Sequence, residues 1–186
     1  MPNWCANSCR MTASQDNPMM GKILDELKKG QDAKWFQAVK PVPQPLMDAE
    51  SSTRHQLSEE GQELAKKYGY SDWYGFCVAE WGTKWEATIE RYVQDGDSVI
   101  VYFDTAWAPP EGIYAAMEAA GIEVEATYIE QGVGFMGYRK DGIDHMCDVP
   151  EYEEDEDGST SQTYYEAIDK VWEDAGMNHA PSNLGG

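Results

Sequence analysis

The sequence predicts an α+β domain, with an antiparallel sheet that carries two helices on one of its faces. Two observations predict it. Two strand-like segments flank a turn at residues 95–97, as expected of a β-hairpin, and a proline-initiated helical segment then leads into a further alternating segment. Together with a strand and a helix near the N-terminus, these segments give a split βαβ arrangement, the ferredoxin-like fold.

The first strand is expected at residues 3–12, where apolar and polar residues alternate loosely. A helix-start signal follows at Asp16-Asn17-Pro18, and Gly30 ends the helix. Its apolar residues recur at helical spacing: Met20, Ile23, Leu24 and Leu27. Residues 35–39 form a short apolar run that is compatible with a strand or an ordered loop. The proline-rich segment 41–45 then excludes a helix or a central strand.

An insertion is expected at about residues 41–80. Within it, Ser58 begins a helix that Gly69 ends, and residues 70–81 are rich in aromatic side chains, which is typical of core packing around a loop or short helix.

The middle third has the clearest pattern. Trp85, Ala87 and Ile89 alternate with Glu86, Thr88 and Glu90, and residues 98–104 form the second strand of the hairpin. Pro109 and Pro110 open the next helix, and Gly121 ends it. Residues 122–127 alternate again, so a strand follows.

Residues 135–138 and 143–147 add a small hairpin across Asp141-Gly142. An acidic run at 151–157 is expected to be solvated, and a last helix follows with Tyr165, Ile168, Val171 and Trp172 on one side. Residues 180–186, and His179 before them, are expected to be loose. The predicted organisation is therefore a ferredoxin-like domain over 1–148 and an acidic linker with a C-terminal helix over 149–186.

Charge is the unusual feature of the composition. The chain of 186 residues has 34 acidic and 14 basic residues and a net charge of −20. Without the six acids of 151–157 the charge is still −14, so the excess belongs to the folded part. Such a chain cannot neutralise a run of phosphates, which excludes direct nucleic-acid binding and disfavours an anionic membrane surface. Neither a membrane-spanning segment nor a signal peptide is evident, so we expect a cytoplasmic protein with free thiols.

Several phrases of the sequence resemble those of the YubB-like family, small proteins of plasmids and phages with a ferredoxin-like domain. The phrases are the opening Met-Pro-Asn-Trp-Cys at 1–5, Trp-Gly-Thr-Lys-Trp at 81–85 and Phe-Asp-Thr-Ala-Trp-Ala-Pro-Pro at 103–110. A looser fourth comprises Tyr128, Glu130, Gly132, Phe135 and Gly137. The resemblance covers about residues 1–138 and implies the fold and a mobile-element origin, but no activity and no catalytic residues.

The tryptophan phrases allow two interpretations. In the first, Trp81, Trp85 and Trp107 are buried anchors and Gly82 makes a tight turn. In the second, these three tryptophans line a small aromatic pocket in which Lys84 binds an anion.

Motifs for chemistry are sparse, and the sequence predicts no catalytic residue, metal or cofactor. Cys5 with Cys9, and His145 with Cys147 beside Asp144 and Asp148, lack the paired spacing of structural zinc sites. A Cys147–His145 dyad lacks a third, orienting group, and no phosphate-binding loop is present.

The strongest functional indication is therefore the charge. If Ile89 and Val124 point into the core, alternation places Glu86, Glu90, Glu123 and Glu125 on the opposite, open face of the sheet. Carboxylates on that face either keep the protein dispersed or imitate the DNA backbone.

The sequence thus favours a non-enzymatic protein of a phage or plasmid that blocks a basic host protein, such as a nuclease, restriction enzyme, CRISPR complex or repressor. The expected contacts are the four sheet glutamates together with Glu151, Glu153, Glu154, Asp155, Glu156 and Asp157. Two alternatives stay open: a small-molecule- or metal-dependent enzyme near the tryptophan phrases and the 144–148 cluster, and a structural or assembly module of a virus.

Overall fold

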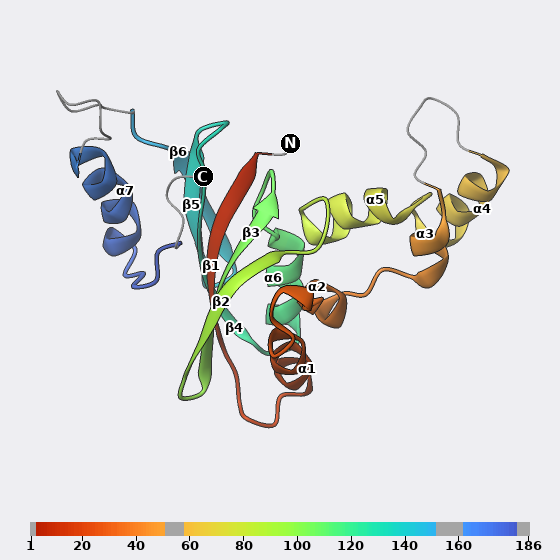
Figure 1. The fold of residues 1–186 in the computed structure, drawn as a ribbon, viewed down its shortest axis with the longest axis horizontal. Coiled ribbons are helices and arrows are strands. Elements are labelled where there is room, and N and C mark those ends of the chain that lie inside the picture. Colours follow the sequence, from red (N-terminus) through yellow and green to blue (C-terminus); the bar gives the residue numbers. More distant parts are fainter. Residues whose placement is uncertain (1–2, 51–57, 152–161, 182–186) are drawn as a thin grey trace.

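A single antiparallel sheet organises the chain in a computed structural model that describes residues 3–50, 58–151 and 162–181 (Figure 1). Its strand order within the described residues is β2-β3-β1-β4-β5-β6. The strands are β1 (Trp4–Thr12), β2 (Thr88–Asp95), β3 (Ser98–Ala106), β4 (Glu123–Glu130), β5 (Phe135–Lys140) and β6 (Ile143–Asp148).

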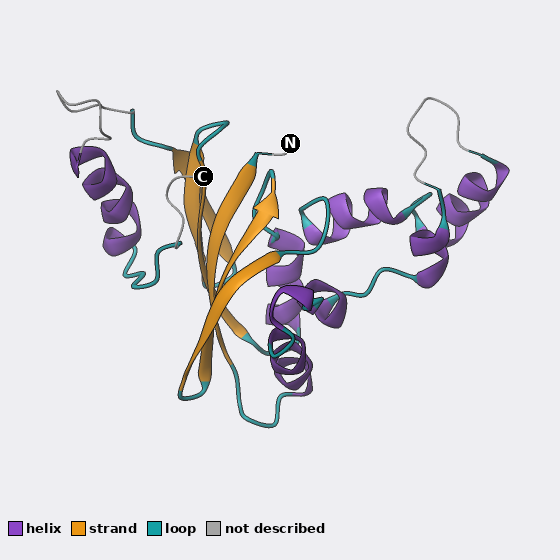
Figure 2. Cartoon of the chain, in the orientation of Figure 1, coloured by secondary structure: helices purple, strands orange, loops and turns teal. Residues whose placement is uncertain are grey.

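The central four strands have the expected connections. Helix α1 (Pro18–Leu27) follows β1, and helix α6 (Glu111–Ala119) joins β3 to β4. Strand β1 lies between β3 and β4 and is antiparallel to both. The ferredoxin-like α+β arrangement is therefore confirmed, with α1, α6 and the short helix α2 (Trp35–Val39) on one face of the sheet (Figure 2).

Both expected hairpins are present. Strands β2 and β3 pair across the turn at Gly96, with a register irregularity between Ile89 and Arg91. Strands β5 and β6 pair across Asp141 and Gly142, which both have positive φ (52° and 73°), the conformation that a two-residue hairpin turn requires. This second hairpin pairs with β4, so β4 is an inner strand rather than an edge.

Residues 35–39 form helix α2, and neither a strand nor a loop. Trp35, Phe36 and Val39 are buried together, and the Trp35 and Phe36 rings pack edge-on against Phe103 of β3 with centroids 5.1 and 6.1 Å away. One helical turn brings all three apolar side chains to the core, so packing decides the conformation of a run whose pattern is ambiguous.

The segment expected as an insertion contains α3 (Gln44–Asp48), α4 (Glu59–Tyr68), α5 (Trp73–Phe76) and a π-helical turn η2 (Cys77–Trp81). Helix α4 begins and ends as expected: the Ser58 hydroxyl accepts a hydrogen bond from the Gly61 N–H at 3.0 Å, and Gly69 has a φ of 84°. Helices α3 and α4 lie away from the sheet (Figure 1). A further 3-10 turn, η1 (Gly30–Asp32), follows α1.

The second face of the sheet is partly covered, contrary to the expectation of helices on one face only. Helix α7 (Gln162–Asp174) packs Ile168 and Trp172 against Ile129 and Met136, and the Trp172 indole N–H donates to the Gly137 carbonyl at 2.9 Å. The amphipathic pattern of α7 predicts a buried side but does not say which surface it covers. Figure 2 shows α7 on the side of the sheet opposite α1 and α6.

The segment after α7 is also held against this face. His179 is buried; its Nδ1 lies 3.2 Å from the Ser8 hydroxyl, and the Thr127 hydroxyl donates to the His179 carbonyl at 2.7 Å. The expectation that His179 belongs to a loose tail is therefore wrong. Among the described helices, none combines the length and the apolar character needed to cross a membrane.

Candidate functional site

Three segments far apart in the sequence meet at one end of the sheet. They are the start of β1, the residues after η2 and the loop that follows β3. The Trp107 N–H donates to the Asn3 carbonyl at 2.9 Å, and the Thr83 hydroxyl donates to the Ala106 carbonyl at 2.9 Å. The tryptophan phrases of the sequence therefore form one structural unit.

Gly82 makes the close approach of these segments possible. It has a φ of 86°, and a Cβ atom there would lie 3.0 Å from the Glu111 nitrogen and 3.1 Å from the Pro109 carbonyl oxygen. A residue with a side chain would strain the backbone and crowd the start of α6. The expectation of a tight turn at Gly82 is confirmed.

At this end of the sheet Lys84 lies over two tryptophan rings, and a third tryptophan lies beside one of them. Lys84 Nζ lies 4.6 Å from the ring centre of Trp85 and 5.0 Å from that of Trp107, and the Trp4 ring lies 6.3 Å from Trp85. Trp4 is 45% exposed and Trp107 is 42% exposed. We call Trp4, Lys84, Trp85 and Trp107 the tryptophan cluster.

The structure brings together three of the four residues expected in an aromatic pocket: Lys84, Trp85 and Trp107. The fourth, Trp81, points into the core, where its indole N–H donates to the Lys40 carbonyl at 2.8 Å and its ring packs on Phe36. Its placement in the pocket was wrong. The burial expected for Trp107 under the structural interpretation is also wrong.

Trp4 is the member that the sequence analysis missed. The residue is the first of a mostly buried strand, and its alternation with Cys5 was the one signal of an outward direction.

The conformation of Trp107 is strained. Its φ of 72° lies in the left-handed region, where a bulky residue costs about 1–2 kcal/mol. Strain of this kind is found at functional sites more often than elsewhere. The strained backbone here directs a large ring towards solvent.

A pocket of about 250 Å³ opens beside Trp4. Its floor includes Ala6 and Ile129, which belong to β1 and β4, and Asp104 of β3 lines it with Trp4. The other lining residues lie just before β1, at the end of β4 and in the turn after β4: Asn3, Glu130, Gln131 and Gly132. Burial, and then the negative charge of Glu90, raise the pKa of Asp104 to about 6.

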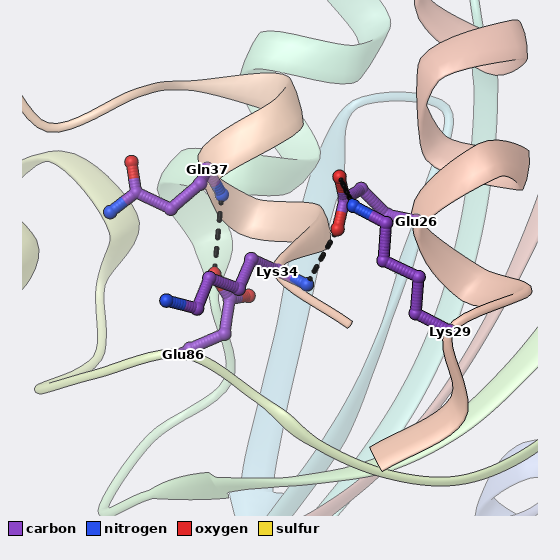
Figure 3. A network of polar contacts seen from close by, with 5 residues as sticks. All are labelled: Glu26, Lys29, Lys34, Gln37 and Glu86. Atoms are coloured by element: carbon purple, nitrogen blue, oxygen red, sulfur yellow. Dashed lines mark hydrogen bonds and ion pairs between the residues drawn. The ribbon is translucent and has the colours of Figure 1, made fainter. Parts of the chain in front are cut away.

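Glu86 does not lie on the open face of the sheet, so its expected position was wrong. Its carboxylate accepts a hydrogen bond from the Phe36 N–H at 2.8 Å. It also accepts one from the Gln37 N–H at 3.3 Å (Figure 3). It thus satisfies free donors at the start of α2. Burial raises the pKa of Glu86 to about 7, although these hydrogen bonds oppose the rise.

A second carboxylate in the same region serves the backbone in a similar way. Glu26 of α1 accepts a hydrogen bond from the Lys34 N–H at 3.0 Å, next to the Glu86 contact with Gln37 (Figure 3). Both carboxylates therefore have a structural role at the start of α2.

The other expected contact residues have different positions. Glu90 and Glu123 are exposed, whereas Glu125 pairs with Lys140 across 3.6 Å. Glu151 is exposed. The remaining acidic contacts lie outside the described residues: Glu153, Glu154, Asp155, Glu156 and Asp157. Of the four glutamates expected on the open face of the sheet, Glu90 and Glu123 are thus the two that are exposed.

The candidate metal ligands do not converge. Cys5 and Cys9 are buried on β1, and four residues of strand separate them by about 13 Å, too far to bind one ion. Within residues 3–50, 58–151 and 162–181, no group of three His, Cys, Asp or Glu side chains could hold a metal ion.

The cluster at 144–148 is divided by the alternation of β6. His145 stacks on Tyr138 with ring centres 4.6 Å apart, while Asp144 accepts a hydrogen bond from the Tyr128 hydroxyl at 2.7 Å on the opposite face. Burial and the charge of Asp148 raise the pKa of the Cys147 thiol, which disfavours the thiolate that a nucleophile needs.

The looser fourth phrase has a structural role. A Cβ atom at Gly137 would lie 2.5 Å from the Tyr128 hydroxyl oxygen, and the Tyr128 ring also packs against Phe135. Glu130 accepts hydrogen bonds from the N–H groups of Gly132 and Val133 at 2.8 and 2.6 Å. These residues fix the turn between β4 and β5 and one border of the pocket.

The fold and the site define an α+β protein with a ferredoxin-like domain and an exposed aromatic surface at one end of its sheet. The family model described as "Ferredoxin-like domain in Api92-like protein" matches residues 80–175, just over half of the chain. The chain therefore belongs to this family of Api92-like proteins.

The chain is also similar to a solved structure, the crystal structure of the protein Api92 from Yersinia pseudotuberculosis. It is 10% identical, with a TM-score of 0.41, over 82% of this chain and 100% of that one. No curated protein matches the chain.

Proposed function

We propose that the chain is a non-enzymatic binding protein of a plasmid or phage, which attaches to a basic, nucleic-acid-binding protein of the host and blocks it. The observation that carries the proposal is the tryptophan cluster at one end of the sheet, in a chain of net charge −20. Two of its tryptophans, Trp4 and Trp107, are more than 40% exposed. The resemblance of the tryptophan phrases to the YubB-like family supports the mobile-element origin.

The two parts of this surface would contribute differently to binding. Exposed tryptophans are typical centres of protein interfaces, where truncation of one often costs 2 kcal/mol or more, or about 30-fold in Kd. The net charge would attract a basic partner over a distance of about one Debye length, roughly 8 Å at physiological salt, and raise the association rate. The partner would thus be selected by charge and held by the aromatic rings.

The geometry modifies the DNA-mimic idea. Because Glu86 caps α2 and Glu125 pairs with Lys140, a regular row of carboxylates on the sheet does not carry the proposal. The contact residues that we propose are the tryptophan cluster and Glu90, an exposed residue of β2. Glu123, Glu151 and the acids of 153–157 would add long-range attraction.

An affinity experiment with the tagged chain tests this function. A bacterial lysate is passed over the wild-type chain at low and at high salt, and the captured protein is purified and assayed for nucleic-acid binding with and without the chain. We expect a basic protein that is captured at low salt, released at high salt and inhibited by the chain. Nucleic-acid binding that is unaffected by saturating chain would contradict the proposal.

Two variants make the test specific for the cluster. Trp4→Ala should weaken capture about 30-fold. Tyr165→Ala removes another aromatic side chain, 36% exposed on α7, and should leave capture unchanged. Equal capture by both variants would show that the tryptophan cluster is not the contact surface.

A further inference from the structure

The pocket beside Trp4 contains one carboxylate that the fold uses and one that it does not. Glu130 is 1% exposed, and its two oxygens accept the hydrogen bonds from Gly132 and Val133. Asp104 also lines the pocket, and no hydrogen bond or ion pair joins its carboxylate to any other described residue. The Asp104 carboxylate is partly withdrawn from water and has no hydrogen bond or opposite charge among the described residues to compensate, which is unfavourable unless a ligand provides one.

The negative potential at Asp104 is reinforced by its neighbours. Asp104 lies opposite Thr88 of β2 and Ala6 of β1 in the sheet, and Glu90 is close enough for its charge to act on the Asp104 carboxyl group. The negative charges of Asp104 and Glu90 together favour a positively charged ligand over a neutral or anionic one.

Trp4 provides a second attraction for a cation. Its ring lines the same pocket and is 45% exposed, so its face is accessible to a ligand. A cation within about 6 Å of a tryptophan ring centre is stabilised by about 0.5–1 kcal/mol at an exposed site and more where water is excluded. A carboxylate and an indole in one pocket form a suitable site for an ammonium or guanidinium group.

The described cations near this end have other contacts. Lys84 lies over Trp85 and Trp107, and the Arg91 guanidinium lies 3.6 Å from the ring centre of Tyr102. Neither of these two cations pairs with Asp104, so the carboxylate is available to a cation from outside the chain.

The size of the pocket restricts the ligand further. Pockets for cofactors and drug-sized molecules usually measure about 300–1,000 Å³. A volume of about 250 Å³ is small for such a ligand, but it accommodates one long side chain.

We infer that this pocket receives an arginine or lysine side chain of the basic partner, with its charged group between the Trp4 ring and the Asp104 carboxylate. The inference rests on the proposed function, because it names the part of the partner that the surface recognises. Asp104 would supply the charge preference, and Trp4 would supply the aromatic contact.

Small probes test the pocket without the partner. The indole N–H signal of Trp4 is followed by NMR, with Trp4→Phe to assign it, during titration with N-acetyl-arginine amide and N-acetyl-lysine amide. We expect a saturable shift with a Kd on the order of 1 mM for at least one of them. The neutral analogue N-acetyl-citrulline amide should bind at least tenfold more weakly. No saturable shift with either cationic amide, or equal binding of the citrulline amide, would overturn the assignment.

Matched charge variants show whether Asp104 is responsible. Asp104→Asn should weaken binding of the cationic probe at least tenfold, whereas Glu123→Gln, which removes one charge at the other end of β4, should change it less than twofold. Thermal unfolding of each variant confirms that it is folded. Equal binding by Asp104→Asn and the wild type would overturn the assignment, as would tighter binding of tetramethylammonium than of both amides, since that would indicate a free organic cation.

Failure of the pocket assignment can be distinguished from failure of the proposed function. If a basic partner is captured equally by the wild type and by Asp104→Asn, the pocket assignment fails while the proposed function stands. If the probes bind in the charge-dependent way but no basic partner is captured, the pocket is supported and the proposed function fails.

Discussion

The N–H of Trp107 donates a hydrogen bond to the carbonyl of Asn3 across 2.9 Å, and the tryptophan has a φ of 72°. This bond joins the loop after β3 to the start of β1 and holds Trp107 in a conformation that costs about 1–2 kcal/mol for a residue of its size. The ring gains little burial in return, because 42% of the residue stays exposed. The proposed binding role would account for this combination, because an exposed ring can contribute to an interface without contributing to stability.

Substitution of Trp107 by glycine separates the two contributions. Because glycine adopts positive φ without strain, Trp107→Gly should leave the free energy of unfolding unchanged or raise it by up to about 1 kcal/mol. The same variant should lower capture of the basic partner at least tenfold. Urea denaturation and affinity capture measure the two effects.

A core tryptophan provides the comparison. Trp81→Ala should lower the free energy of unfolding by about 3–5 kcal/mol, since Trp81 is 2% exposed and packs on Phe36. A comparable loss of stability in Trp107→Gly would show that Trp107 is a structural residue.

Local patterns were sufficient to predict most of the fold. Alternation around Gly96 and Gly142 predicted both hairpins, and the Asn17 side chain caps α1 as its sequence position suggests, accepting from the Met19 and Met20 N–H groups at 3.0 Å. These features depend on residues close in the sequence. Helix α2 was not predicted, because its conformation depends on Phe103, more than sixty residues away.

The site was predicted only in part, because some of its residues are brought together by tertiary contacts that local patterns do not reveal. Lys84, Trp85 and Trp107 were expected together because their phrases are distinctive. Trp4 joins them through pairing of β1 with β3, which no local pattern reports. Glu86 has the alternation of an outward strand residue, yet it lies just before β2 begins at Thr88, and its contact with α2 is tertiary.

A test of Glu86 distinguishes its hydrogen bonds from its charge. The folded pKa of about 7 is above the ordinary value, so this group contributes stability that is fully present below about pH 4.5 and lost as the pH rises through 7. Glu86→Gln retains one acceptor and cannot ionise, so its unfolding free energy should be close to that of the wild type near pH 4.5 and exceed it by up to about 3 kcal/mol at pH 8.

Removal of the acceptor gives the matching control. Glu86→Ala leaves the Phe36 and Gln37 N–H groups without this partner and should cost about 1 kcal/mol near pH 4.5. Because alanine cannot ionise, this deficit relative to the wild type should disappear or reverse at pH 8. Denaturation curves at the two pH values measure both variants. Identical pH dependence in Glu86→Gln and the wild type would refute the role of ionisation.

Gly137 should be intolerant of any side chain. A Cβ atom there would lie 2.2 Å from the His145 carbonyl oxygen and 2.5 Å from the Tyr128 hydroxyl oxygen, so Gly137→Ala should cost about 2–3 kcal/mol through overpacking of β5 against β6. Gly21→Ala is the control: nothing lies within 4 Å of its Cβ position in α1, and alanine should stabilise that helix by up to about 1 kcal/mol. Thermal unfolding compares the two, and similar melting temperatures would contradict the packing argument.

Acid should release α7 from the second face of the sheet before the rest of the fold opens. Burial, and then the positive charge of Arg10, lower the pKa of His179 to about 4, whereas an unfolded histidine titrates near 6.5. The unfolded segment therefore binds the proton more readily, and the stability from neutral His179 is present above about pH 6.5 and lost as the pH falls towards 4. The shift limits this loss to about 3 kcal/mol.

Hydrogen exchange of the α7 amides between pH 7 and pH 4.5, corrected for the intrinsic rate, measures this release. Protection of α7 should fall earlier than that of β1, which is paired on both sides by β3 and β4. The ion pair of Glu125 with Lys140 also weakens in acid, so His179→Gln is needed to isolate the histidine. In this variant α7 should start from lower protection at pH 7, because the contact of Nδ1 with the Ser8 hydroxyl is changed, but should lose much less as the pH falls. Parallel loss of protection in the wild type and the variant would show that carboxyl groups, not His179, set the acid sensitivity of this helix.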